Sequence, residues 1–282
     1  MESVQKLTHV EHVLKRPDSY VGPVDKTHES YWLLNNTNKN FQNKNISYSP
    51  ALLKIFDEIL VNAIDRNSLH PKNVTQISVS VDKETGAVTI ENNGPLGGIS
   101  VRMNEKEGVW NPELTFGHLL TSTNYDDNQK RIVGGRNGYG AKLTNIYSSE
   151  FSVVIKDHET KQTYTQKWSN NMTICHPPKL TKHSAATSSA SITFTPDWKR
   201  FGMKEIDINI YKIFEKRVWD ANICTTPNCK VKFNGEALPK TTFEAYAKMH
   251  EGVTNVCSVT TDRWSVCVGP SENGLEQVSF VN

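Results

Sequence analysis

The sequence has no run of apolar residues near the roughly 18 that a membrane span needs, and its first 20 residues lack the apolar core of a signal peptide. We therefore expect an intracellular protein without a membrane partner. It also lacks an excess of one charge, because 32 Lys and Arg against 30 Asp and Glu leave a net charge of +2. A general polycationic coat for nucleic acid is excluded, so any role on DNA needs a local patch or another part of a larger machine.

Closely spaced cysteine pairs are also lacking among the five cysteines. Cys224 and Cys229 form one loose pair, and Cys175 precedes His176, but a structural zinc site needs a second close pair. We interpret the cysteines as reduced structural thiols without a metal. The length of 282 residues, with 37% apolar and 22% charged residues, indicates an ordinary globular protein of one large or two smaller domains.

An amphipathic helix is predicted over residues 50–66, because apolar residues recur there at helical spacing: Leu52, Phe56, Ile59, Leu60 and Ala63. Glu58, Asn62 and Asp65 follow at i, i+4 and i+7, which aligns them in a polar stripe beside the apolar one. Pro50 suits the first turn of this helix.

The other elements alternate strands with helices. Further helices are predicted at 10–20, 111–120, 206–221 and from the end of a glycine-rich segment at 134–142 to about 148. Strands are predicted at 77–81, 87–90, 151–156, 162–168, 190–195 and 230–233, the first two as an antiparallel hairpin. Residues 35–45 hold six Asn and are predicted to form an exposed loop, and a hairpin is predicted at 264–281 around Pro270–Gly274.

The glycine-rich segment 134–142 suits phosphate binding, since glycine lets backbone N–H groups converge on an anion. It is not a Walker A loop, because Lys142 is separated from Gly140 by Ala141 and is followed by Leu143. It is not a dinucleotide fingerprint either, because no βαβ unit surrounds it. Taken alone, the segment is more typical of a flexible turn.

Four features follow one another in the sequence: an acidic residue on a helix, an Asn four residues later, Asn-Asn-Gly after a strand, and a glycine-rich loop before a helix. Together they resemble the signature of a known family. FDEILVNAID at 56–65 resembles the first box of the ATPases shared by gyrase, heat-shock chaperones and histidine kinases. TSTNYDD at 121–127 followed by GGRNGYGAKLTNI at 134–146 is narrower, and resembles eukaryotic-type topoisomerase II. The resemblance extends from EHVLKRPDSYVG at 11–22 to QVSFVN at 277–282, so it covers nearly the whole chain.

The resemblance implies an α+β fold: a two-layer α/β sandwich whose mixed, mostly antiparallel sheet is backed by helices (the Bergerat-type ATPase fold). Residues 1–258 are then the ATP-binding ATPase domain, and 259–282 are the first strands of a truncated transducer domain. The implied function is the N-terminal ATPase module of a type II DNA topoisomerase, which binds Mg-ATP. This module dimerises to capture a DNA duplex and couples hydrolysis to passage of one duplex through another. The implied partners are a second copy and double-stranded DNA, and the implied location is nuclear.

The resemblance also assigns site residues. Glu58 matches the general base, which accepts a proton from the attacking water, although a lone helix glutamate is usually just solvated. Asn62 matches the residue that gives Mg²⁺ a neutral oxygen, with a buried or capping amide as the alternative. Asn92 matches the adenine contact, although Asn-Asn-Gly is also a turn signal. The ribose and phosphate contacts match Ser122, Thr123 and Asn124, and the lid over the triphosphate matches Gly135, Arg136, Asn137, Gly138, Tyr139, Gly140, Ala141 and Lys142.

The sequence departs from the family pattern at several places. The segment Pro95-Leu96-Gly97-Gly98 makes the loop after Asn92 two residues longer, and Arg66 stands where relatives usually have Asn. Val4 stands where an aromatic residue of the dimer contact is common. The sequence ends before the family's Gln-Thr-Lys loop and DNA-cleavage domain, so we expect this chain to hold ATP, to hydrolyse it poorly and not to cut DNA. A competing hypothesis is a nucleotide-gated dimerisation module with negligible turnover.

Overall fold

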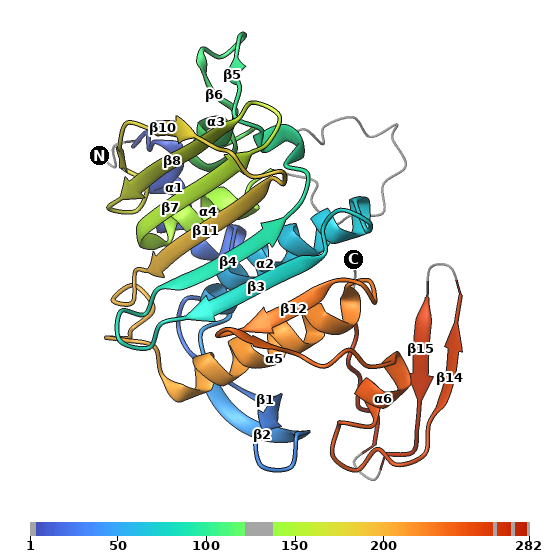
Figure 1. The fold of residues 1–282 in the computed structure, drawn as a ribbon. Helices are drawn as coiled ribbons and strands as arrows, with labels where there is room; N and C mark the ends of the chain where they lie inside the picture. The colour runs from blue at the N-terminus through green and yellow to red at the C-terminus, as the bar shows by residue number, and fades with distance from the viewer. Residues whose placement is uncertain (1–3, 122–137, 262–263, 272–273, 281–282) are drawn as a thin grey trace.

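The computed structural model describes residues 4–121, 138–261, 264–271 and 274–280 (Figure 1). Its central feature is a sheet of nine strands within these ranges, in the order β10-β8-β7-β11-β4-β3-β12-β13, with β9 paired to β8. Every pairing in this sheet is antiparallel except that of β12 with β3. The strands are β3 Gln76–Val81, β4 Val88–Asn93, β7 Ser148–Asp157, β8 Gln162–Ser169, β9 Ile174–Cys175, β10 Lys179–Lys182, β11 Ser189–Pro196, β12 Lys230–Phe233 and β13 Glu236–Ala237.

Helices back one face of this sheet. Figure 1 shows α1, α2, α4 and α5 behind the strands. The helices are α1 His9–Lys15, α2 Pro50–Leu69, α3 Asn111–Gly117, α4 Gly140–Ile146, α5 Ile208–Cys224 and α6 Phe243–Ala247, with the 3₁₀ turns η1 Pro17–Ser19 and η2 Gly97–Ile99. The predicted α+β class, with a mixed, mostly antiparallel sheet backed by helices, is confirmed.

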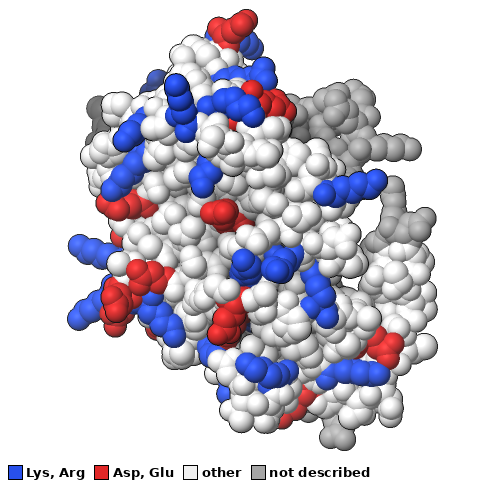
Figure 2. Space-filling model, in the orientation of Figure 1, with Lys and Arg blue, Asp and Glu red and all other residues white. Residues whose placement is uncertain are grey.

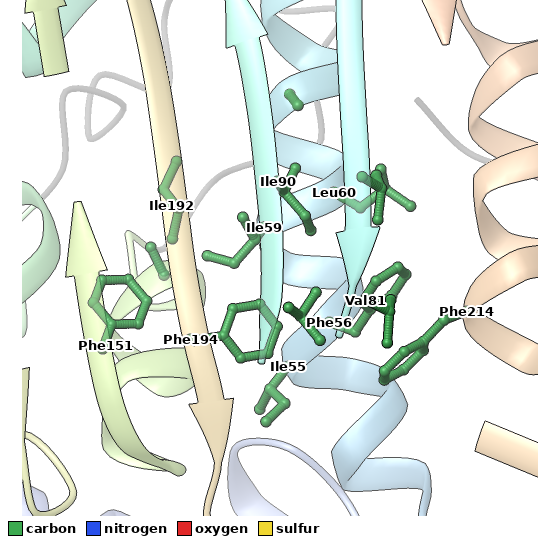
Figure 3. Packing of buried hydrophobic residues seen from close by; sticks show 14 of the residues in the cluster. Ile55, Phe56, Ile59, Leu60, Val81, Ile90, Phe151, Ile192, Phe194 and Phe214 are labelled. Carbon is green, nitrogen blue, oxygen red and sulfur yellow. The ribbon is translucent and has the colours of Figure 1, made fainter. Parts of the chain in front are cut away.

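Helix α2 begins at Pro50 as predicted and ends at Leu69, three residues beyond the predicted end at 66. The side chain of Ser49 accepts a hydrogen bond from the backbone N–H of Leu52, and Pro50, which has no N–H to leave unpaired, is the first helical residue. The apolar stripe is buried against the sheet, and Figure 3 shows Ile55 and Ile59 among side chains of β4 and β11. On its other flank α2 meets α5, where the ring of Phe56 stacks on that of Phe214 with centroids 4.0 Å apart. Glu58 and Asn62 of the polar stripe lie on neither of these packed flanks and retain exposed surface.

The expected exposed loop at 35–45 is wrong. Strands β1 Thr27–Asn35 and β2 Asn40–Tyr48 form an antiparallel hairpin through these residues, and it contacts α5. Its asparagines hid the strand pattern, although Phe41 is fully buried against Trp219 and Tyr246. A second small hairpin, β5 Met103–Asn104 with β6 Val109–Trp110, was also not expected.

The predicted terminal hairpin is misplaced. Strands β14 Cys257–Thr260 and β15 Ser265–Val268 pair with each other, so the turn falls earlier than Pro270–Gly274. The described residues from 274 to 280 have no regular secondary structure. Elsewhere the predicted elements are confirmed within a few residues, including β12 at 230–233 and the β3–β4 hairpin. None of the helices in the described ranges is long and apolar enough to span a membrane.

Candidate functional site

A cleft of about 1250 Å³ opens between α2, the central strands and α4. Its apolar wall includes Ile59 and Ala63 from α2, Ile90 from β4 and Ile192 from β11. Its polar wall is the stripe of α2, which contributes Lys54, Glu58, Asn62, Asp65 and Arg66. The sandwich of helices on a sheet thus leaves one concave space that is apolar on one side and charged on the other, the usual form of a small-molecule site.

Glu58 lies where α2 meets the beginning of α4. Its carboxylate Oε1 is 2.5 Å from the Nζ of Lys54, one turn earlier, and its side chain is 23% exposed. Gly140 lies against the other carboxylate oxygen, because a Cβ built at Gly140 overlaps Oε2. Helix α4 is tied to α2 at this point, since the Thr144 hydroxyl donates to the Ile55 carbonyl over 2.8 Å. A carboxylate is therefore held at the edge of the cleft, next to a backbone that carries no side chain.

Asn62 and Arg66 follow Glu58 at intervals of one turn along α2 and also line the cleft. Asn62 is exposed, and no other described residue hydrogen-bonds its side chain. Arg66 is half-buried, and burial lowers the pKa of its guanidinium although Asp65 opposes that shift. The guanidinium lies against Gly97, where an added Cβ would overlap Nη1.

Asn92 and Asn93, adjacent in sequence, have different surroundings. Asn92 is 6% exposed and lines the cleft, with its amide donating to the Asn93 carbonyl over 3.1 Å. Asn93 accepts hydrogen bonds from the backbone N–H groups of Thr75 (2.9 Å) and Gln76 (2.8 Å). Asn93 therefore fixes the start of β3, and Asn92 is the one available to a ligand.

Lys142 is the most deeply buried charge of the site, at 3% exposed. Its ammonium donates to the carbonyls of Thr121 (2.7 Å) and Gly138 (2.5 Å), the residues on either side of 122–137. Burial lowers its pKa to about 8. No carboxylate of the described residues lies within 4 Å of it, so the folded chain holds a desolvated cation whose partners are neutral carbonyls.

The structure brings eight of the predicted site residues to the cleft. The cleft is lined by Glu58, Asn62, Asn92, Gly138, Tyr139, Gly140, Ala141 and Lys142. Ser122, Thr123, Asn124, Gly135, Arg136 and Asn137 lie outside the described residues. The sequence reasoning missed Lys54, although its i, i+4 spacing to Glu58 was a usable signal. It also missed Asn104 and Lys106 of the unexpected β5–β6 hairpin, for which no signal was available.

A buried ion network supports α2 from behind. Asp57, next to Glu58 in sequence, faces α5 and accepts from the Nε of Arg217 over 2.9 Å. Arg217 also pairs with Asp220 (2.8 Å), and Asp220 with Lys216 (2.5 Å). Burial acts to raise the pKa of Asp220, but Lys216 and Arg217 overcome this and lower it. Neighbouring carboxylates thus have separate roles: Asp57 anchors the helix, and Glu58 faces the cleft.

Known proteins resemble both the sequence and the fold. DNA topoisomerase 2 of Saccharomyces cerevisiae is 39% identical over 301 aligned residues, which include all of this chain and 21% of the yeast protein. The crystal structure of the ATPase region of that organism's topoisomerase II matches with a TM-score of 0.91 and 40% identity, over 95% of this chain and 71% of that one. The ATPase and transducer domains of DNA topoisomerase II from Balamuthia mandrillaris match with a TM-score of 0.90 and 39% identity, over 96% and 69%. No protein-family model matches the chain.

The fold is therefore that of a topoisomerase II ATPase region. The chain belongs to the eukaryotic DNA topoisomerase II family, and it spans about a fifth of the length of the curated relatives it matches.

Proposed function

We propose that this chain is the ATP-binding module of a type II DNA topoisomerase and that the cleft along α2 holds Mg-ATP. The observation that carries the proposal is the meeting of Glu58, Asn62, Asn92 and Lys142 in one cleft, in a chain of this family. These residues come from α2, β4 and α4, and fit opposite ends of one elongated ligand. Asn92 suits the base, and Lys142 suits the phosphates.

The chemistry of the cleft fits a magnesium-bound triphosphate. Lys142 is desolvated and has no carboxylate partner among the described residues. A phosphate anion would supply the negative charge that its ammonium group lacks. Asn62 presents a neutral amide to the cleft, and one protein oxygen suffices for Mg²⁺, which takes other ligands from water and phosphates. Bound Mg²⁺ would neutralise part of the phosphate charge.

Glu58 is the proposed general base. Two contacts support this role: the carboxylate pairs with Lys54 and lies against Gly140 at the edge of the cleft. In this role it orients a water and accepts a proton from it. Ser122, Thr123 and Asn124 are proposed to contact ribose and phosphate. The residues Gly135 to Lys142 are proposed to form the lid over the phosphates.

The wider roles are proposals that rest on the family. We propose that residues 1–258 form the ATPase domain and 259–282 begin a transducer domain, that ATP binding drives homodimerisation, and that the whole protein passes DNA duplexes in the nucleus. On the face shown in Figure 2, Lys and Arg are interspersed with Asp and Glu.

Binding of a non-hydrolysable ATP analogue with Mg²⁺, measured by calorimetry on this chain, tests the site without requiring turnover. We expect saturable binding at one site per chain, and weaker binding when EDTA replaces Mg²⁺. Absence of binding at millimolar analogue would refute the proposed function.

The competing function, a binding module without turnover, is tested in a parent chain that continues through the second domain. Glu58→Gln keeps size and polarity but removes proton acceptance, so binding should persist while phosphate release falls roughly 10²- to 10⁴-fold. Glu150→Gln is the matched control, because Glu150 is 59% exposed in a surface pair with Lys167. Unchanged release in Glu58→Gln contradicts the base assignment. A wild-type parent that binds but releases no phosphate favours the binding module.

A further inference from the structure

Arg66 is a cleft residue that the proposed mechanism does not use. It follows Asn62 by one turn of α2 and lines the same cleft. Because successive turns place Glu58, Asn62 and Arg66 along one side of the helix, the three side chains follow the cleft in that order. Asn92, at the end of β4, lines the cleft as well, and the loop that follows it contacts Arg66.

Within the described ranges the guanidinium of Arg66 has no paired carboxylate, although the charge of the adjacent Asp65 opposes the lowering of its pKa by burial. It makes no ion pair there within 4 Å, and no described residue accepts a hydrogen bond from it, although it carries five N–H donors. The other half-buried or buried arginine of this region, Arg217, is paired with both Asp57 and Asp220. A partly desolvated cation without an acceptor is unfavourable in the free chain, and an anionic ligand in the cleft would relieve it.

Gly97 makes room for this side chain. Its φ is +60°, a conformation that glycine adopts without strain, and a Cβ there would overlap Nη1 of Arg66. Gly97 belongs to the loop that is two residues longer than the family pattern. The two departures of the sequence from that pattern, Arg66 and the longer loop, are therefore in contact with each other.

We propose that Arg66 binds the phosphate nearest the nucleoside, and that Gly97 holds the guanidinium in place for it. This rests on the proposed function. In the proposed complex the terminal phosphate lies by Glu58 and the base lies by Asn92. Arg66 is one turn beyond Asn62 and touches the loop after Asn92, so it faces the phosphate that is nearest the base. The planar guanidinium of Arg66 can donate two parallel hydrogen bonds to two oxygens of one phosphate. The amide of an Asn at this position could not make both bonds and carries no charge.

The test compares Arg66→Gln with wild type by calorimetry, using adenosine, AMP and ADP without added metal. We expect AMP and ADP affinity to fall roughly tenfold to hundredfold, as for loss of a charge-assisted contact, and adenosine affinity to change less than about twofold. Arg200→Gln removes an exposed arginine that does not line the cleft, and it should leave all three affinities unchanged.

Gly97→Ala supplies an independent test that keeps the arginine. It should weaken AMP and ADP binding by displacing the guanidinium, and add no further loss in the Arg66→Gln background. Gly235→Ala is the matched control, because Gly235 also has a positive φ (+86°) but has open space around an added Cβ. Equal losses for adenosine and AMP, or no loss in Arg66→Gln while wild type binds normally, would overturn this inference alone. Failure of wild type to bind any adenine nucleotide would overturn the proposed function and this inference with it.

Discussion

Lys142 should make the stability of the free chain depend on pH in a predictable direction. Burial lowers its pKa in the folded state from 10.5 to about 8. Below pH 8 both the folded and unfolded states hold the proton, and the folded state bears the whole penalty, about 3 kcal/mol at 1.36 kcal/mol for each pKa unit. Between pH 8 and 10.5 the unfolded state binds more protons than the folded state, so the free energy of unfolding rises with pH.

The magnitude can be isolated with Lys142→Met, which removes the titrating group and keeps much of the packing. From about pH 7 to about pH 9.5 the wild-type chain should gain about 2 kcal/mol relative to the variant, because other titrating groups cancel in the comparison. Urea unfolding at both pH values measures the four free energies. At the lower pH the variant should be as stable as wild type or more stable, since the lost bonds to Thr121 and Gly138 offset only part of the relieved penalty.

The same substitution should abolish a proton uptake on ligand binding. A triphosphate beside Lys142 favours the charged form, so wild-type binding near pH 8.5 should take up a fraction of a proton. Calorimetry in buffers of different ionisation enthalpy detects that uptake. Lys167→Met, in which an exposed lysine is lost, serves as the control for both measurements. A relative change below about 0.5 kcal/mol, or one of opposite sign, would refute the argument that Lys142 is desolvated in the free fold.

Three further predictions concern neighbouring residues. Asn62→Ala should remove most of the gain in analogue affinity that Mg²⁺ gives, whereas equal affinity for both chains at saturating Mg²⁺ would exclude a metal role. Gly140→Ala should reduce turnover in the parent chain, because the new Cβ displaces the Glu58 carboxylate; an unaltered rate of phosphate release would show that Glu58 tolerates the shift. Arg217→Met should lower the free energy of unfolding by about 3 kcal/mol, because Asp57 loses its ion-pair partner and Asp220 keeps only Lys216 of its two cations. The loss should be less than about 1 kcal/mol for Lys26→Met in the half-exposed pair with Asp207. Similar losses in urea unfolding would contradict that difference.

Local patterns in the sequence predict the elements whose apolar residues repeat regularly. The stripe from Leu52 to Ala63 specified α2, and the alternation at 77–81 and 87–90 specified the β3–β4 hairpin. The same reasoning failed at 35–45, because Asn43 and Asn45 of β2 are exposed and Phe41 is the only apolar residue in that stretch, so no apolar alternation marks the strand. Local sequence patterns also could not predict the strand order, because the parallel pairing of β12 with β3 joins segments that are far apart in the chain.

The site was predictable to the extent that its residues are in recognisable motifs. The motifs place Glu58, Asn62 and Asn92, and the structure brings them to one cleft. Without the family motif, local patterns could not have separated Asn92 from Asn93, since one residue of register decides which amide binds the start of β3 and which faces the cleft. It could not reveal that Arg66 meets Gly97, because that contact depends on how the loop after β4 folds back over α2.

The difference between the paired cations on one side of α2 and the cations without carboxylates on its other side explains why this cleft suits an anion. On the α5 side of α2, the buried cations Lys216 and Arg217 have carboxylates within ion-pair distance. On the cleft side, Lys142 and Arg66 have none among the described residues, and burial lowers the pKa of both. The two cations on the cleft side are desolvated without a compensating carboxylate. The free chain is therefore less stable than it would be with apolar residues at these two positions. A bound polyphosphate would offset this desolvation cost by supplying negative charge to both cations. Substitutions at Lys142 or Arg66 that stabilise the free chain should therefore weaken the complex.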